Sequence, residues 1–292
     1  MRRNWPCLAL LVCMLGDAEA HGTAAEVPRF TFDPLVTVPL GASLLLFLAG
    51  VVRVWNRGGP GSGIRHWQVR CFTAGWAMLV LALVTPLHWL GERLFAAHMV
   101  EHELLMIGAA PLLVIARPFP AFVWGLPKLW RPCVGLFLKA VAGTWPWRAV
   151  MDARVATAIH GIAIWVWHLP QAFASALASP WVHWLQHMSF LFSAILFWWA
   201  LLRDRRREGV AVMMLFITAL HSGMLGILLT LARRPLYPAQ PTAGGWGMTA
   251  LEDQQAAGLL MWIPPGFIYL GAALALLALW MRRASVHMEV ST

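Results

Sequence analysis

Two pairs of histidines in this chain have a spacing that suits a transition metal. His98 and His102 form one H-x-x-x-H pair, and His183 and His187 form a second. Residues four apart lie on the same face of an α-helix, and imidazole nitrogens are common ligands of copper and zinc. Both pairs fall in apolar segments of helix length, where an ionisable side chain is costly and usually functional. The pattern predicts a metal site inside a membrane.

Other donors occur near these pairs. We expect His168 at a similar depth on a neighbouring segment and His221 nearer the middle of the membrane. Met99 and Met188 each adjoin a paired histidine, and thioether sulfur together with imidazole suits copper, above all Cu(I). Copper is therefore the expected metal. Its predicted ligands are His98, Met99, His102, His168, His183, His187, Met188 and His221.

The remaining histidines have simpler interpretations. We expect His66, His88 and His160 to be ordinary interface or packing residues, because a single histidine bonded to a neighbouring helix is common in membranes. Among the paired residues, His183 is the most open to that interpretation. His21 has an alternative role, since a mature N-terminus there could chelate Cu(II) through its amine and its imidazole.

Two carboxylates stand beside the first pair. Glu101 and Glu103 would be expensive in a membrane unless they were paired, protonated or coordinating. We hypothesise that Glu101 orients an imidazole. Glu103 would pair with Arg93 or with a group on a neighbouring helix.

The composition is that of an integral membrane protein. Of 292 residues, 60% are hydrophobic and only 12% are charged, whereas soluble domains have about 25% charged residues. The net charge of +9 is spread between apolar segments, so it indicates membrane topology rather than a nucleic-acid partner. Cys71 and Cys133 are far apart and form no CxxC motif, which disfavours a disulfide scaffold or a thiolate zinc site.

The first twenty residues have the features of a cleavable signal peptide. Arg2 and Arg3 precede a short apolar run, and Ala18-Glu19-Ala20 is a small-x-small cleavage motif. An uncleaved anchor is the alternative, but the apolar run is short for a span. We expect a signal peptide at 1–20, a short outer segment at 21–33, a transmembrane domain at 34–281 and a cytoplasmic tail at 282–292.

The expected fold is an all-α, polytopic membrane protein with seven transmembrane helices. Each candidate has about the 20 apolar residues that a span requires. The segment from Phe119 to Trp147 is interrupted by prolines and basic residues, so we expect an interfacial loop with one short amphipathic helix there. The seven predicted spans are Pro34 to Trp55, Val69 to Trp89, Leu94 to Ala116, Val155 to Leu177, Trp181 to Leu202, Val210 to Ala232 and Ala257 to Met281.

Basic residues predict the orientation of these spans. With the mature N-terminus outside and the C-terminus in the cytoplasm, the outer loops hold only Arg29, Arg93, Arg233 and Arg234, and the other loops hold the rest. At a rise of about 1.5 Å per residue, both histidine pairs and His168 then lie in the outer half of the bilayer. His160 lies nearer the inside.

Several segments, taken in order, resemble a known family. From His98 the chain reads HMVEHELLMIGAAPLLVIARP, which is similar to the H-M-x-x-H-x-L-L-M pattern of the multispan CtaG-like cytochrome c oxidase assembly factors. Further matching segments are WVWHLP from Trp165, VHWLQHMSFLFSAILFWW from Val182, GILLTLARRPLYP from Gly226 and EDQQAAGLLMWIPPGFIYL from Glu252.

The resemblance implies a seven-span bacterial plasma-membrane protein, not an enzyme, that helps to assemble haem-copper oxidases by handling copper. Oxidase subunits and a periplasmic copper donor would be its partners. Glu101, Glu103 and the single proline of Ala110-Pro111 depart from the family pattern. The matching residues are His98, Met99, His102, Met106, His168, His183, His187, Asp253, Gln254, Gly258, Met261 and Trp262.

Asp253 has two interpretations. Its position just before the last span predicts a helix N-cap. The resemblance suggests in addition that it faces the outer histidines.

Two other functions use the same residues. A membrane redox protein could employ the histidines as axial haem ligands, although two H-x-x-x-H pairs do not demand that geometry. A copper transporter would need ligands through the whole membrane depth, and the inner half offers only His160. No nucleophile with a base and an orienting group indicates catalysis.

Overall fold

The computed structural model describes residues 28–203, 208–237 and 246–290, and these residues form helices and no strands. The expected signal peptide and His21 lie outside the described residues. The helices, in chain order, are α1 (Pro34–Gly58), α2 (His66–Leu83), α3 (Pro86–Gly91), α4 (Phe95–Glu103), η1 (Leu104–Ala109), α5 (Ala110–Ala116), α6 (Phe119–Gly125), α7 (Trp130–Gly143), α8 (Trp145–Val150), α9 (Ala153–Trp167), α10 (Pro170–Ala178), α11 (Pro180–Arg203), α12 (Glu208–Thr230) and α13 (Ala250–Val290).

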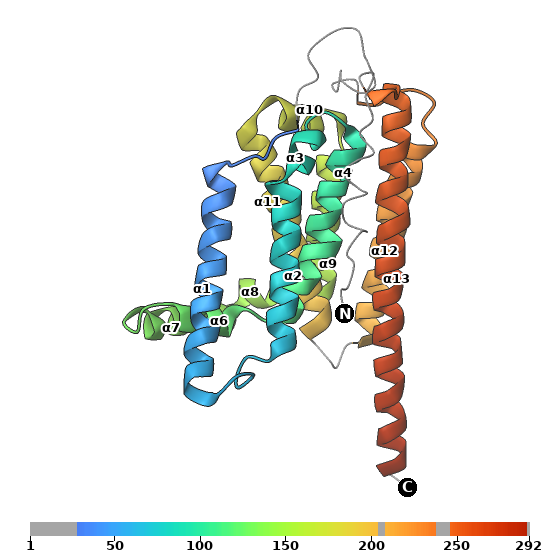
Figure 1. The fold of residues 1–292 in the computed structure, drawn as a ribbon. Helices are drawn as coiled ribbons and strands as arrows, with labels where there is room; N and C mark the ends of the chain where they lie inside the picture. The colour runs from blue at the N-terminus through green and yellow to red at the C-terminus, as the bar shows by residue number, and fades with distance from the viewer. Residues whose placement is uncertain (1–27, 204–207, 238–245, 291–292) are drawn as a thin grey trace, which may run out of the picture.

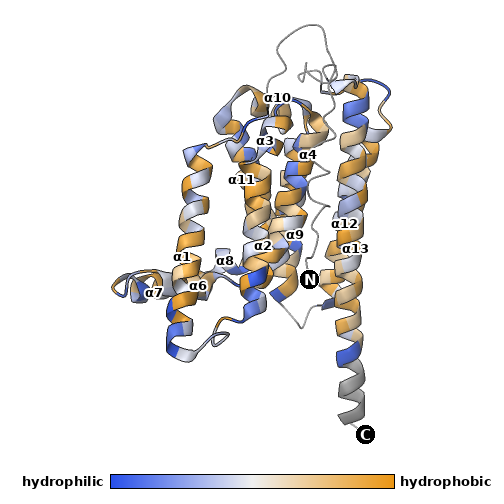
Figure 2. Cartoon of the chain, in the orientation of Figure 1, coloured by the Kyte–Doolittle hydropathy of each residue, from blue (hydrophilic) through white to orange (hydrophobic). Residues whose placement is uncertain are grey.

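The long helices run roughly parallel and form one bundle (Figure 1). Their middles are apolar and their ends are more polar (Figure 2). Among the described residues, five helical stretches are long and apolar enough to cross a membrane. They correspond to the first, third, fifth, sixth and seventh predicted spans, and they are Pro34–Gly58, Phe95–Ala116, Pro180–Arg203, Glu208–Thr230 and Ala250–Arg283.

Each of the other two predicted spans is divided by a proline. The segment predicted as Val69 to Trp89 is α2 followed by the short helix α3, which begins at Pro86. The segment predicted as Val155 to Leu177 is α9 followed by α10, which begins at Pro170. Proline has no N–H to continue a helix and disfavours helical backbone in the residue before it. The short helices α3 and α10 therefore lie at one end of the bundle, the upper end in Figure 1.

The third span contains a π-helical segment, η1, directly after Glu103. Pro111 explains it in part, because this residue cannot donate the backbone hydrogen bond that a regular α-helix needs there. The indole of Trp198 on α11 donates to the Met106 carbonyl at 2.9 Å and so satisfies a backbone group within η1. π-Helical turns often occur at functional sites, and this one follows the first histidine pair.

The stretch from Phe119 to Trp147 contains more helix than the sequence predicts. Instead of one short amphipathic helix in a loop, it forms α6, α7 and the start of α8, and α7 runs across the bundle direction (Figure 1). The backbones of α1 and α6 touch. A Cβ on Gly50 would lie 1.8 Å from the Ala121 carbonyl oxygen, and one on Gly125 would lie 2.1 Å from that of Leu46. Glycine at both positions is what permits this contact.

Candidate metal centre

Helices α4 and α11 bring the two histidine pairs together. The ring centroids of His98 and His183 are 5.3 Å apart, and those of His102 and His187 are 5.2 Å apart. Glu101 joins them, because residues three apart also share a helix face. One ligand atom from each of four residues lies within 4.8 Å of the others. This cluster, called here the outer cluster, consists of His98, Glu101, His183 and His187.

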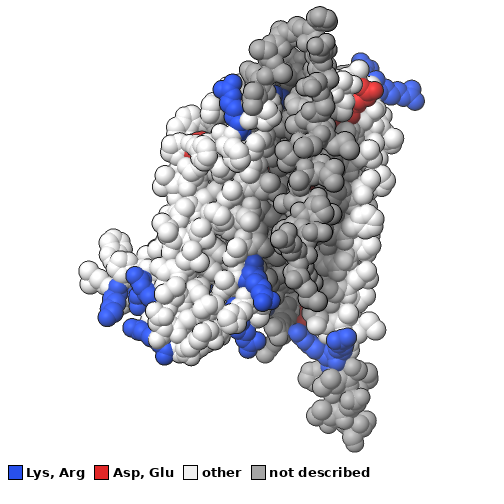
Figure 3. Space-filling model, viewed as in Figure 1, with Lys and Arg blue, Asp and Glu red and all other residues white. Residues whose placement is uncertain are grey.

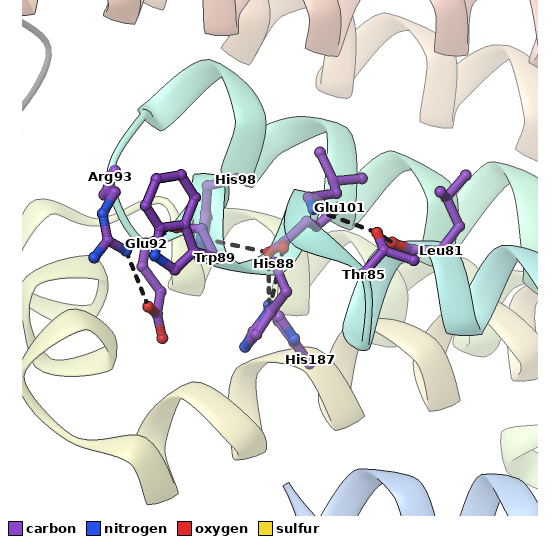
Figure 4. Close-up of polar contacts among 10 residues, drawn as sticks. Leu81, Thr85, His88, Trp89, Glu92, Arg93, His98, Glu101 and His187 are labelled. Carbon is purple, nitrogen blue, oxygen red and sulfur yellow. Dashed lines mark hydrogen bonds and ion pairs between the residues drawn. The ribbon is translucent and has the colours of Figure 1, made fainter. Parts of the chain in front are cut away.

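The two oxygens of Glu101 face different histidines (Figure 4). Oε1 lies 3.1 Å from Nδ1 of His88, on α3. Since an ionised carboxylate only accepts, His88 donates this hydrogen bond through Nδ1. Oε2 lies 3.9 Å from Nδ1 of His98 and 3.8 Å from Nε2 of His187. One oxygen is thus held by a hydrogen bond, and the other faces the ligand atoms of the outer cluster.

The outer cluster and its neighbour His102 have buried polar atoms that form no hydrogen bond with any described residue. Both nitrogens of His98 and of His102 are in this state, as are Nε2 of His183, Nε2 of His187 and Oε2 of Glu101. Burying such groups unpaired is costly, yet here they converge on one another. Three imidazoles and one carboxylate are a suitable donor set for Cu(II) or Zn²⁺. These residues therefore fit a metal ion.

The predicted sulfur ligand Met99 lies beside a different histidine. Nδ1 of His168 is 2.6 Å from the Ile164 carbonyl and Nε2 is 3.4 Å from the Met99 sulfur. Because a carbonyl only accepts, Nδ1 carries the proton and Nε2 presents a lone pair toward the sulfur. His102 lies between this pair and the outer cluster, with its ring centroid 4.3 Å from that of His98 and 6.4 Å from that of His168.

The remaining two predicted ligands differ in position. Met188 lines a cavity that also reaches His183 and His187. His221 is not brought to the outer cluster. It lies beside α9, where a Cβ on Gly161 would be 3.3 Å from its Nε2. Depth in the membrane was the only guide to His221, and depth does not determine which neighbour a helix face meets.

Sequence reasoning missed His88, which was expected to be an ordinary interface residue. Its ring stacks on that of His183 with centroids 5.4 Å apart, besides the hydrogen bond to Glu101. Thr85-Pro86 was the available signal, because the break at this proline starts the helix that carries His88. The role predicted for Glu101, orienting an imidazole, agrees with its contact to His88, but its second oxygen belongs to the outer cluster as well.

The pairing suggested for Glu103 with Arg93 is not what the structure shows. Nη1 of Arg93 donates to the Trp89 carbonyl at 3.0 Å and lies 3.5 Å from Glu92. Oε2 of Glu103 is buried and has no hydrogen-bond partner among the described residues.

Asp253 is a helix cap, but for a different helix from the one predicted. Its carboxylate accepts from the backbone N–H of Phe95 at 2.7 Å and of Ala96 at 2.9 Å, at the start of α4. Its own helix, α13, is capped by Thr249 and Glu252. The Glu252 carboxylate accepts from the Thr249 backbone N–H, and the Thr249 hydroxyl oxygen accepts from the Glu252 backbone N–H. Asp253 thus fixes the N-terminus of the helix that carries His98, Glu101 and His102.

A cavity of about 590 Å³ leads to the outer cluster from the end of the bundle where α3 and α10 lie. His183 and His187 form part of its wall, and Asp33 and Glu92 contribute carboxylates to it. Arg93 also lines the cavity and lies 3.5 Å from Glu92, so its guanidinium offsets one of these two carboxylates.

Comparison with known proteins identifies the family of the chain. The family model described as cytochrome c oxidase caa3 assembly factor matches residues 45–283, which is most of the chain and contains every residue of the outer cluster. No curated protein and no solved structure matches. A match of this extent shows that the chain belongs to the family of cytochrome c oxidase caa3 assembly factors.

Proposed function

We propose that this assembly factor binds copper in the outer cluster and delivers it to an oxidase subunit without catalysing a reaction. The observation that carries the proposal is the convergence of three buried imidazoles and the Glu101 carboxylate, whose facing atoms lie within 4.8 Å of one another and include several without hydrogen bonds. A group held there would be ligated by His98, Glu101, His183 and His187.

Two considerations favour copper: the kind of oxidase that the family assembles, and the donor atoms in and beside the outer cluster. Haem-copper oxidases need copper for their own centres, and the family assembles such an oxidase. The outer cluster has the nitrogen and oxygen donors that suit Cu(II), and the adjacent His168 and Met99 offer the nitrogen and sulfur donors that suit Cu(I). Zinc would fit the outer cluster but would gain little from a thioether.

We also infer the membrane topology. The chain crosses the bacterial plasma membrane seven times after a cleaved signal peptide, with α2 and α9 as the two shorter spans, the N-terminus outside and the C-terminus in the cytoplasm. Basic side chains gather toward the lower end in Figure 3, where α1 ends, as the positive-inside rule requires of the cytoplasmic side. The outer cluster then faces the periplasm, where a copper donor and the copper-binding parts of an oxidase are accessible.

The two alternatives fit the structure less well. A haem needs a flat open slot for its porphyrin ring between two axial ligands, whereas the rings of His98, His183 and His187 pack against one another, with centroids 4.4 to 5.8 Å apart. A transporter needs a series of ligands through the membrane, but among the described His, Cys, Asp and Glu residues only one group of three or more converges as metal ligands would. The inner His160 is engaged with Ser193, whose Oγ is 3.0 Å from its Nδ1.

A complementation experiment tests the proposed delivery. A strain lacking this protein would receive wild type, His98→Ala plus His187→Ala, or the control His221→Ala, which changes a histidine outside the outer cluster. We expect the double variant alone to give membranes with low oxidase activity and low oxidase copper, at equal protein levels. Normal oxidase copper with the double variant would contradict delivery from this cluster.

A further inference from the structure

The crosswise helix α7 has the properties of a segment that lies on a membrane surface. It contains no buried residue. Large apolar side chains on and beside it are open, with Leu129 83% exposed, Leu136 71% and Phe137 66%. Exposed apolar groups of this size are unfavourable in water but are stabilised in the acyl region of a bilayer.

Four cations surround a small cavity where α7 begins. Arg53 and Arg57 come from the last turns of α1, Lys128 precedes α7, and Arg131 is in its first turn. Asn56 completes the described lining of this cavity of about 330 Å³, which includes no acidic residue. The cavity is called here the basic pocket, and cations gather at the lower left in Figure 3, where α7 and the end of α1 lie.

Backbone carbonyls at the end of α6 and just after it hold two of these cations in place. Nη1 of Arg53 donates to the carbonyls of Trp124 and Leu126, each at 2.9 Å. Arg131 donates to the same two carbonyls, each at 3.0 Å. The guanidinium of Arg131 is also 4.8 Å from the centre of the Trp124 ring. The arginines are therefore fixed in position rather than spread apart by repulsion.

The assembled charges repel one another. Desolvation, together with the charges of Arg53 and Arg57, lowers the pKa of Arg131. The guanidinium of Arg57 lies 4.8 Å from the Trp124 ring, and no hydrogen bond from the side chain of Arg57 or Lys128 is present among the described contacts. An anion in the pocket would relieve this repulsion and accept from both side chains.

We propose that the basic pocket binds the phosphate headgroup of an anionic phospholipid, with the lipid's acyl chains along the exposed apolar side chains of α7. A lipid fits better than free phosphate because Lys128 and Arg131, which line the pocket, flank the exposed Leu129 in the chain. The end of α1 is also where a bilayer places its headgroups, and clusters of basic residues there attract anionic lipids. That this is the inner leaflet follows from the orientation inferred above. The site does not depend on copper binding.

Native mass spectrometry of the full-length protein in detergent tests the proposal. Phosphatidylglycerol and phosphatidylcholine with the same acyl chains would be titrated separately into wild type, R57Q plus K128Q, and the charge-matched control R70Q plus R148Q. The first pair leaves the anchoring bonds of Arg53 and Arg131 intact. The control pair removes two exposed arginines outside the pocket.

We expect wild type and the control to retain phosphatidylglycerol in preference to phosphatidylcholine, and the pocket variant to bind phosphatidylglycerol roughly tenfold or more weakly. Equal retention of the two lipids by wild type, or an unchanged affinity in the pocket variant, would overturn the proposal. Displacement of phosphatidylglycerol from wild type by millimolar inorganic phosphate would also overturn it, since the pocket would then be a site for a free anion.

Discussion

His88 holds one oxygen of Glu101, with 3.1 Å between Nδ1 and Oε1, and thereby leaves Oε2 facing His98 and His187. The imidazole comes from the short helix α3, which begins at Pro86 after α2 has ended at Leu83. A ligand carboxylate that is oriented by a neighbour loses less entropy when it binds metal, which is why such partners affect affinity.

Replacing His88 by alanine should weaken copper binding by about 10- to 100-fold without abolishing it, because the orienting hydrogen bond is lost while the outer cluster remains. Titration of purified protein against a chelator of known affinity measures the change. His66→Ala serves as the control, since this residue lies at the start of α2, against Trp55. An unchanged affinity in His88→Ala would show that Glu101 needs no orienting partner.

Gly91 should not tolerate a side chain. A Cβ there would lie 2.8 Å from Cδ and from Oε2 of Glu101, so Gly91→Ala would displace the carboxylate or strain α3. We expect a loss of copper affinity and of about 1 to 3 kcal/mol of stability. Gly41→Ala, which places its Cβ in open space, is the matched control, and both are compared by thermal unfolding and chelator titration. Equal behaviour of the two variants would contradict the predicted clash.

Asp253→Ala should reduce both stability and copper binding. The carboxylate caps the N-terminus of α4, and removing such a cap costs about 0.5 to 2 kcal/mol. Asp152→Ala removes the cap of α9, where Asp152 Oδ1 accepts from Arg154 N at 2.9 Å. The control should lose comparable stability but keep its copper affinity. If both variants bound copper normally, the position of α4 would not depend on this cap.

Met99→Leu should weaken the binding of Cu(I) more than the binding of Cu(II). The sulfur lies 3.4 Å from Nε2 of His168, which is not one of the four residues of the outer cluster. We expect retention of Cu(I) under reducing conditions to fall while Cu(II) binding persists. Met188→Leu is the control for removal of a sulfur near the same site. An equal loss of both oxidation states in Met99→Leu would indicate a packing defect instead.

The sequence predicted the helical class, the apolar segments and the meeting of the two histidine pairs, because helical periodicity and hydrophobic length are local properties. Whether α2 and α9 complete a set of seven spans stays a prediction. Rotation of a helix about its own axis is not local, so His221 was grouped with residues that it does not approach. The same limit hid the cap that Asp253 provides for α4, since the two are joined only by tertiary packing.

His88 shows a second limit. A histidine at the end of an apolar segment is usually an interface residue, and only the break at Pro86 turns this one toward Glu101. The length of α7 and of its neighbouring helices was also underestimated, because prolines at the first turns of α6 and α8 begin helices there rather than interrupt one.

The most direct test of the central claim is the metal content of detergent-purified protein after copper loading, with an optical spectrum of the same sample. Wild type would be compared with a variant in which His98, His102, His183 and His187 are alanine, and with His221→Ala. Copper binding by the outer cluster predicts about one copper per chain in wild type and in His221→Ala, none in the fourfold variant, and no Soret band. Absence of copper from wild type, or its full retention in the fourfold variant, would contradict the claim.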